Sequence, residues 1–434
     1  LKKSLTCASL SLFPSSLISQ LKNNRLRTAH IGVGGMGGAD LNSISSHNLV
    51  DVVALCDVDS NALDKAKKLH PNAKVFSDYR KLFNEISDSI DAVIVSTPDH
   101  THAPASMMAM HMRKSVYCQK PLTHHVSEAR EMKKLAEENN LVTQMGIQIH
   151  SFDEYKSAVV LIQSGIIGKV STVRAWSPKN WGYDGLEPEG SDPIPENLDW
   201  NLWLGTAKKR SYKDKIYHPG QWRKLLDYGC GTLGDMGVHI FDTPYAALDL
   251  DVPNTVKNEC RKSNGFGHPE HNKVSYVFPG TKYTKENLKW VWYDGEGAPK
   301  KHKDLILPDD EKLPDQGAIF IGDKGRLLLP HWDFPKLIIN GKYEKLYCPK
   351  LNEGDHCPLC EAREALLMEG SKKAKDMARD YSPRKYYVVK GIDRDNEDHG
   401  VKFWRYKHKY TGDGVQDKLM PIFKLKGDLS LIHI

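Results

Sequence analysis

Gly32-Val33-Gly34-Gly35-Met36-Gly37 follows directly on the short apolar segment Thr28–Ile31. The stretch fits G-x-G-x-x-G, in which the first glycine turns the chain, the second lets backbone approach a pyrophosphate, and the third lets a helix pack on a strand. A helix that starts here presents free N–H groups and a partial positive charge to phosphates. The stretch therefore predicts a dinucleotide phosphate loop, with a glycine turn of some other α/β fold as the alternative.

Around this loop, residues 28–147 alternate short β-branched runs with amphipathic segments. Strands that alternate with helices form βαβ units and a parallel sheet. We expect helices over 62–69 and 126–139, and strands in the following segments: 29–31, 50–55, 92–95, 115–117 and 142–145. The sequence thus predicts a doubly wound α/β dinucleotide-binding domain over 28–147.

Asp57 ends the second predicted strand. An acid at this place accepts the ribose hydroxyls of NAD and repels the 2′-phosphate of NADP. The sequence therefore favours NAD over NADP.

Two further loops follow later parallel strands, where ligands of such sheets bind. One is Ser96-Thr97-Pro98-Asp99-His100-Thr101-His102, and the other is Gln119-Lys120-Pro121. A lysine held beside the cofactor can exchange a proton with the reacting hydroxyl.

From about residue 148 the pattern changes to successive strands and to tryptophan-rich loops that we expect to lie over a pocket. Strands are predicted over 274–278, 288–293, 317–321 and 326–329. Residues 148–346 are therefore expected to form an α+β domain with a mostly antiparallel, open sheet.

Asp235, His239 and Asp242 are spaced i, i+4 and i+7, so on a helix they share one face. A carboxylate one turn from an imidazole orients it and raises its basicity, which suits removal of a hydroxyl proton. The alternative is a hydrogen-bonded core histidine with Asp235 as a helix cap.

Together these motifs resemble the Gfo/Idh/MocA family of NAD(P)-dependent oxidoreductases over about 28–345. The resemblance also includes the Gly146-x-Gln148 segment. It implies hydride transfer between NAD(P) and a secondary hydroxyl of a sugar, cyclitol or related polyol, by a homo-oligomeric enzyme. The implied catalytic residues are Lys120, Asp235 and His239. The implied cofactor-binding residues are Gly32, Gly34, Gly35, Met36, Gly37, Asp57, Ser96, Thr97, Pro98, Asp99, His102, Gln119, Lys120 and Gln148.

Two departures from the family pattern stand out. Gln119 replaces the usual glutamate of a Glu-Lys-Pro motif, which removes a charge beside Lys120. The family's closing segment, which returns to the first domain, is missing after about residue 346. Substrate contacts are expected from Asp235, His239 and the loop residues before them, with ordinary loop packing as the alternative: Lys179, Trp181, Tyr183, His218, Trp222 and Arg223.

The C-terminal part carries a cysteine cluster of a different kind. Cys348, Cys357 and Cys360 supply three thiolates, and C-P-x-C before a helix is typical of a zinc knuckle. His356, His331 and His408 are candidates for a fourth ligand. A remnant without metal and a set of reactive thiols are the alternatives.

Beyond this cluster, two predicted strands alternate basic and aromatic residues, as stacking of bases and neutralisation of phosphates require. Residues 347–428 resemble the core of T4-type phage single-stranded-DNA-binding proteins, with a partial OB-like fold and a zinc site. The resemblance implies single-stranded DNA binding, with a solvated basic surface as the alternative. The implied contacts are Tyr386, Lys402, Phe403, Trp404, Arg405 and Tyr406.

The two ends differ from the rest. Residues 1–27 resemble a truncated export signal of the twin-arginine type, which predicts a periplasmic protein, or a cytoplasmic one if the segment is no signal. Residues 429–434 resemble a translated adapter, so the simplest account of the two modules is an assembly chimera joined near 345–348.

Composition limits the function classes. The chain has 434 residues, 40% of them apolar and 27% charged, as in soluble globular proteins. No apolar run is long enough for a membrane-spanning helix. The net charge of +6 is too small to require a nucleic acid or an anionic membrane.

Overall fold

The computed structural model describes residues 25–299, 302–344, 386–392 and 401–407, and scattered positions between 360 and 379. The chain divides into two compact units, one ending at Glu344 and the other beginning at Lys345.

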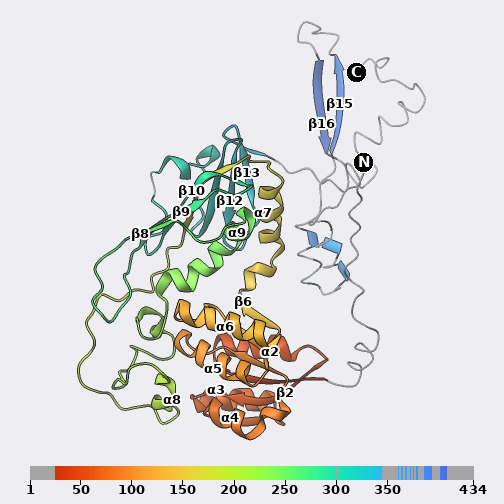
Figure 1. Cartoon of the computed structure of the whole chain (residues 1–434). Coiled ribbons are helices and arrows are strands. Elements are labelled where there is room, and N and C mark those ends of the chain that lie inside the picture. Colours follow the sequence, from red (N-terminus) through yellow and green to blue (C-terminus); the bar gives the residue numbers. More distant parts are fainter. Residues whose placement is uncertain are drawn as a thin grey trace. The chain divides into compact units, whose positions relative to one another are not determined.

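A parallel six-stranded sheet forms the first part of the larger unit (Figure 1), and its strand order is β3-β2-β1-β4-β5-β6. This order and direction confirm the predicted doubly wound fold. Its strands are β1 (Leu26–Ile31), β2 (Val50–Cys56), β3 (Lys74–Phe76), β4 (Ala92–Val95), β5 (Ser115–Gln119) and β6 (Thr143–Gly146). Its helices are α2 (Met36–Ser45), α3 (Ser60–Leu69), α4 (Tyr79–Ile86), α5 (Asp99–His111) and α6 (Val126–Asn139), with the short helix η1 (Ser87–Ser89).

Two apolar clusters hold these helices to the sheet. One joins Leu41 of α2 and Ala66 of α3 to Leu55 of β2. The other joins α4, α5 and α6 to the central strands, where Val93 and Val95 are fully buried. Because helices cover both faces, the carboxyl ends of the strands are the open edge at which a ligand can bind.

An eight-stranded sheet forms the second part, in the order β14-β13-β12-β11-β7-β10-β9-β8. Every neighbouring pair is antiparallel except β7 with β10, which confirms the predicted mostly antiparallel sheet. Its strands are β7 (Val170–Trp176), β8 (Thr255–Glu259), β9 (Lys273–Pro279), β10 (Thr284–Tyr293), β11 (Gly317–Gly322), β12 (Arg326–Pro330), β13 (Lys336–Ile339) and β14 (Lys342–Glu344).

Helices α7 (Asp153–Gln163) and α9 (Val238–Leu248) pack on this second sheet (Figure 1) through an apolar cluster that includes Trp290 and Phe320. A π-helical turn, η4 (Leu233–Gly237), runs directly into α9. The remaining short helices are η2 (Gln148–Ser151), α8 (Trp200–Leu204), η3 (Gln221–Lys224), η5 (Lys303–Leu305) and η6 (Pro308–Asp310).

The tryptophans of the second part match the expectation of loops over a pocket only in part: Trp181, Trp203 and Trp222 line a cavity, and others are purely core residues. Trp176 ends β7 and is buried, and Trp200 and Trp203 lie in α8, where their rings stack 4.8 Å apart. Trp200, Trp203 and Trp222 belong to one aromatic cluster with Tyr217 and Tyr228. Most of these rings therefore form core, because aromatic side chains bury large apolar areas.

In the second unit, β15 (Tyr386–Ile392) and β16 (Val401–Lys407) pair as an antiparallel hairpin. They correspond to the two strands that the sequence predicts. Cys360 is helical and buried. Cys348, Cys357, His356 and His408 lie outside the described residues, as do residues 1–24 and 429–434. The zinc site, the OB-like fold, the export signal and the adapter-like tail therefore stay predictions.

Two kinds of feature are absent from the described part of the chain. Within it, no helix is both long and apolar enough to cross a bilayer. The same residues contain no group of three or more His, Cys, Asp or Glu side chains placed to hold a metal ion.

Candidate active site

The glycine loop has the geometry that a bound pyrophosphate requires. Gly32 has a φ of +83°, and a Cβ added there would lie 2.6 Å from the carbonyl oxygen of Ser96. A Cβ on Gly37 would lie 2.1 Å from the carbonyl oxygen of Gly32. Only glycine allows this turn and this close packing of α2 on the end of β1.

Asp57 holds the loop in place. Its Oδ2 accepts the backbone N–H of Val33 at 2.8 Å, and its Oδ1 accepts that of Asp59 at 3.0 Å. Burial raises the pKa of the Asp57 carboxyl, while these backbone donors lower it. A carboxylate has further acceptor positions beyond these two bonds, so Asp57 remains able to accept ribose hydroxyls.

A cavity of about 1030 Å³ connects the glycine loop with the second sheet. Most of the predicted site residues line it. They are Gly32, Gly34, Gly35, Met36, Asp57, Ser96, Thr97, Pro98, Asp99, His102, Gln119, Lys120, Gln148, Lys179, Trp181, His218, Trp222, Arg223, Asp235 and His239. Gly37 and Tyr183 are outside this lining, since Gly37 lies under the loop and Tyr183 packs on Phe266 with ring centroids 5.7 Å apart.

Lys120 and Asp235 form the centre of the site. Lys120 follows β5 and Asp235 lies in η4, and the lysine Nζ is 2.6 Å from Asp235 Oδ1 and 3.0 Å from the Asp235 carbonyl oxygen. The indole N–H of Trp181 donates to Oδ2 at 2.7 Å. Lys120, the largest source of positive charge, and Arg223 hold the pKa of the Asp235 carboxyl below its usual value in spite of burial.

His239 lies in the same cavity, but its relation to Asp235 differs from the prediction. Its buried Nδ1 has no hydrogen-bond partner among the described residues. Burial and the charge of Lys120 lower its pKa to about 3, and Asp235 offsets only part of this. Asp235 thus raises the basicity of His239 as predicted, but only in part. The predicted orienting hydrogen bond is not made to Nδ1, because the carboxylate binds Lys120 and Trp181 instead.

Asp242 also lies elsewhere than predicted. Its carboxylate lies 3.0 Å from Nδ1 of His150. A π-helical turn has a wider hydrogen-bond spacing than an α-helix, so the i, i+4, i+7 face does not continue through η4. This turn lies between Asp235 and His239, whereas His239 and Asp242 are three positions apart in α9. Asp242 is not among the residues that line the cavity.

The side-chain amide of Gln119 has a hydrogen-bond partner that explains why an amide stands at this position. Its Nε2 donates to Asp40 of α2, at 3.1 Å to Oδ1 and 2.9 Å to Oδ2, and the Ser96 hydroxyl donates to the same carboxylate at 2.7 Å. A Cβ on Gly146 would lie 2.8 Å from this amide nitrogen, so the glycine makes room for it. The amide links the loops that carry Ser96 and Lys120 to α2.

His102 links two of the predicted loops. The ring is buried, and its nitrogens lie 2.7 Å from the carbonyl oxygens of Pro121 and Thr97. Gln148 lies at the far side of the cavity, where its Nε2 is 3.7 Å from the sulfur of Met36. His102 and Gln148 thus help to position the loops around the part of the cavity that would hold the cofactor.

The predicted substrate contacts divide into two groups. Arg223 stacks on Trp222, 4.2 Å from the ring centroid, and lies 3.4 Å from Asp235. Lys179 also approaches Asp235, at 4.0 Å. His218 instead lies 3.3 Å from Asp59, beside the Asp57 end of the cavity.

Sequence reasoning missed several residues of this site. His331, directly after β12, lines the cavity 6.1 Å from His239 between ring centroids, and its Nδ1 lies 2.7 Å from the Tyr155 hydroxyl. Burial lowers the pKa of His331 to about 4. Asp59 and Asp40 were also missed. An acid directly at a helix start, as at Asp59, was the one available signal.

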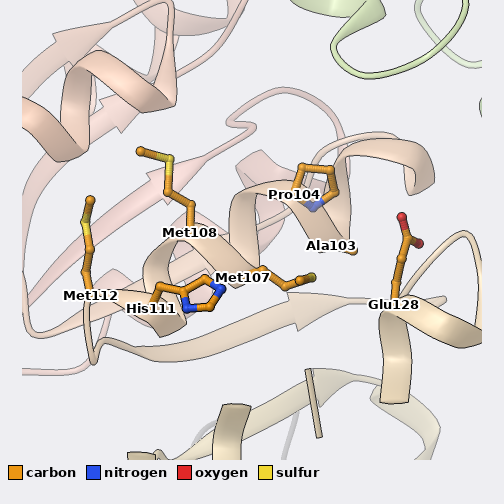
Figure 2. Close-up of a pocket in the computed structure, with 7 residues that line it drawn as sticks. All are labelled: Ala103, Pro104, Met107, Met108, His111, Met112 and Glu128. Atoms are coloured by element: carbon orange, nitrogen blue, oxygen red, sulfur yellow. The ribbon is translucent and has the colours of Figure 1, made fainter. Parts of the chain in front are cut away.

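A second groove of about 530 Å³ lies on α5. Figure 2 shows Met107, Met108 and His111 on α5, Met112 directly after it, and Glu128 on the neighbouring α6. None of the predicted site residues lines this groove. Its lining is mostly apolar, and the predicted catalytic and cofactor-binding residues lie in the larger cavity.

The residues present fit a bound dinucleotide. Helix α2 has no side-chain cap at its N-terminus, and although the N–H groups of Gly37 and Gly38 donate to the Gly34 carbonyl oxygen, the N–H of Met36, its first residue, is left to a pyrophosphate. Gly34 and Gly35 would lie against the phosphates, Asp57 against the adenosine ribose, and Lys120 near the nicotinamide. When bound, NAD supplies the hydride acceptor, and the chain supplies only binding and proton chemistry.

Comparison with known proteins agrees with this geometry. A model described as an oxidoreductase family with an NAD-binding Rossmann fold matches residues 26–147. A second model, described as the C-terminal alpha/beta domain of an oxidoreductase family, matches residues 152–278. Together the two matches span more than half of the chain.

Relatives of this chain are distant. An uncharacterized oxidoreductase of Schizosaccharomyces pombe is 27% identical over 200 residues, 46% of this chain and 44% of the relative. An inositol 2-dehydrogenase of Rubrobacter xylanophilus is 28% identical over 158 residues, 36% of this chain and 44% of the relative. The matches thus span less than half the length of these two curated relatives.

A solved structure shows the same fold. The WlbA dehydrogenase of Chromobacterium violaceum, in complex with NADH and UDP-GlcNAcA, has a TM-score of 0.53 and 14% identity. The match covers 80% of this chain and 87% of that one.

Proposed function

Because the chain belongs to the Gfo/Idh/MocA oxidoreductase family, we propose that it transfers a hydride between NAD(P) and a secondary hydroxyl of a sugar, cyclitol or related polyol. One observation carries the proposal: the glycine loop and the side chains of Lys120, Asp235 and His239 line one cavity. The acid at Asp57 favours NAD over NADP. The similarity to an inositol 2-dehydrogenase supports a polyhydroxylated substrate.

The proton of the oxidised hydroxyl needs an acceptor. Lys120, held by Asp235 at 2.6 Å, donates a hydrogen bond to the substrate oxygen and stabilises charge that develops on it. Neutral His239 accepts the proton through Nε2. As the hydride leaves the carbon for the nicotinamide, the hydroxyl proton passes to this ring nitrogen and the C–O bond becomes a carbonyl.

The test has a binding step and a catalytic step. NADH binding is followed by nicotinamide fluorescence, and NAD reduction is followed with myo-inositol and a panel of sugars. Gly34→Asp abolishes NADH binding. A Cβ at position 34 lies 3.9 Å from Asp57 Oδ2, so the variant places a second carboxylate beside that of Asp57. This additional negative charge repels the phosphates of the cofactor.

Lys120→Met separates the two steps. It retains NADH binding but lowers kcat by about 100-fold or more, the usual size of a lost acid–base contribution. Tyr183→Phe, outside the cavity lining, is the matched control and keeps both activities. A wild-type chain that binds no NADH, or a Gly34→Asp variant that binds it normally, contradicts the proposal.

A second candidate function belongs to residues 347–428. The pairing of β15 with β16 supports it, since the hairpin brings together the two segments that carry Tyr386, Lys402, Phe403, Trp404, Arg405 and Tyr406. We expect salt-sensitive binding of a single-stranded oligonucleotide, weakened about tenfold by Trp404→Ala. Oligonucleotide affinity that is equal in wild type and Trp404→Ala contradicts this function.

A further inference from the structure

Three cations surround one carboxylate in the cavity. Lys120 Nζ lies 2.6 Å from Asp235 Oδ1, Arg223 Nε lies 3.4 Å from the same oxygen, and Lys179 Nζ lies 4.0 Å from Oδ2. All four side chains line the cavity. One carboxylate neutralises one of the three cations, so a net positive charge remains in this part of the cavity.

The neighbouring titratable groups do not remove this excess. Asp99 lies deeper, where burial raises its pKa to about 6 and its Oδ2 accepts the N–H of Cys230 at 3.1 Å. Even when Asp99 is ionised, three cations face two carboxylates. His239 and His331, with pKa values lowered by burial to about 3 and about 4, are neutral near pH 7.

The positive charge is confined to one end of the cavity. The remaining charged lining residues are Asp57, Asp59 and Lys65, from the end of β2 and from α3. That end is acidic, as ribose recognition requires. The excess positive charge therefore lies at the other end of the cavity, where the substrate would bind. The nicotinamide ring of bound NAD⁺ would add a further positive charge there.

Arg223 and Lys179 keep donors free for a ligand. Stacking on Trp222 fixes the guanidinium plane, its Nη1 makes only a 3.5 Å contact with the Gly220 carbonyl, and its Nη2 has no hydrogen-bond partner among the described residues. The Lys179 side chain is 48% exposed, and its 4.0 Å ion pair is too long for a hydrogen bond.

We propose that the substrate carries an anionic group, a carboxylate or a phosphate, which Arg223 and Lys179 bind while Lys120 and His239 act on the hydroxyl. The guanidinium fork suits both anions, and an ammonium beside it adds a point charge. The inference rests on the proposed function and narrows its substrate class to sugar acids or sugar phosphates.

The test uses the full chain with NADH bound and matched acidic and neutral sugars. The ligands are D-glucuronate against D-glucose, D-galacturonate against D-galactose, and D-glucose 6-phosphate. Calorimetry gives each affinity. We expect at least one anion to bind about tenfold or more tighter than its neutral partner, as charge-assisted hydrogen bonds do, and high salt to reduce the difference.

Two variants assign the preference to its residues. Arg223→Gln and Lys179→Gln each reduce about tenfold the preference for the anion, measured as the ratio of the affinities for the anionic and the neutral sugar. Exposed Lys209→Gln is the control for a lost surface charge. If Arg223→Gln fails to fold, Lys179→Gln decides alone.

Each outcome is informative. Tighter binding of the uronates identifies a carboxylate site, and tighter binding of the sugar phosphate identifies a phosphate site. NADH binding without a preference for any anion overturns the inference but leaves the proposed function standing. A preference that survives both variants overturns the assignment to Arg223 and Lys179. Absence of NADH binding overturns the proposed function, and this inference with it.

Discussion

At the scale of single residues, the Gln119 amide donates both of its short contacts to the Asp40 carboxylate, at 2.9 and 3.1 Å. A glutamate at position 119 would place a second carboxylate at that distance from a largely buried first one. Two carboxylates this close cannot both ionise cheaply. The Asp40 carboxylate therefore explains why position 119 holds an amide, where the family resemblance predicts a glutamate.

Gln119→Glu is expected to lower the free energy of unfolding at pH 8 by about 3 kcal/mol, the cost of an unpaired buried charge. The loss shrinks near pH 5, where one of the two carboxyls holds a proton. Urea denaturation at both pH values measures it. The double variant Asp40→Asn with Gln119→Glu restores the amide–carboxylate pair and should recover most of the loss; equal losses in the single and double variants contradict this account.

The residue scale also shows what the sequence could predict about the site. Lys120, Asp235 and His239 could each be selected from a local motif. Their pairing could not, because Lys120 and Asp235 are 115 positions apart and the spacing of Asp235 and His239 suggested a different partner. The resemblance supplied the set of residues, and the fold determined that the carboxylate binds the lysine rather than the imidazole.

At the scale of elements, the contact of α2 with β1 depends on Gly37. Gly37→Ala would force its Cβ to within 2.1 Å of the Gly32 carbonyl oxygen, so α2 must shift away from the strand. We expect a loss of stability of about 2 kcal/mol or more, in the range of overpacked sites, and at least tenfold weaker NADH binding. Ser43→Ala, exposed on the same helix, should change neither; normal NADH affinity in Gly37→Ala contradicts the packing role.

The elements differ in how well the sequence predicted them. β4 and α6 have the predicted bounds, since a short β-branched run and a strong helical periodicity are local signals. β7 was missed. It lies between β10 and β11, and its neighbours are more than 100 positions away, so only tertiary pairing specifies it. The π-helical turn η4 had no local signal either.

At the scale of the whole molecule, buried histidines make stability depend on pH. Burial lowers the pKa of His30 to about 3, of His100 to about 4 and of His239 to about 3. Below about pH 6.5 the unfolded chain binds protons that the folded chain does not. Their contribution to stability is therefore complete above that pH and is lost as the pH falls toward 4. Asp99, whose pKa is raised, opposes this loss in part.

His30→Leu tests this pH dependence. The variant cannot take up a proton at this position, so the loss of stability between pH 7 and pH 5 should be smaller by about 2 kcal/mol than in the wild type. Urea denaturation at the two pH values gives the difference. His111→Leu, whose ring is exposed, serves as the control. An unchanged loss in His30→Leu would show that the buried ring is not a source of acid sensitivity.

The crystal structure of the chain with NADH and an acidic sugar is the most direct test of the central claim that one cavity holds cofactor and proton-transfer groups. The account predicts the pyrophosphate over Gly34 and Gly35 and the substrate hydroxyl within about 3 Å of both Lys120 Nζ and His239 Nε2, the reach of proton transfer. A nicotinamide ring more than about 10 Å from Lys120, far beyond that reach, would contradict it.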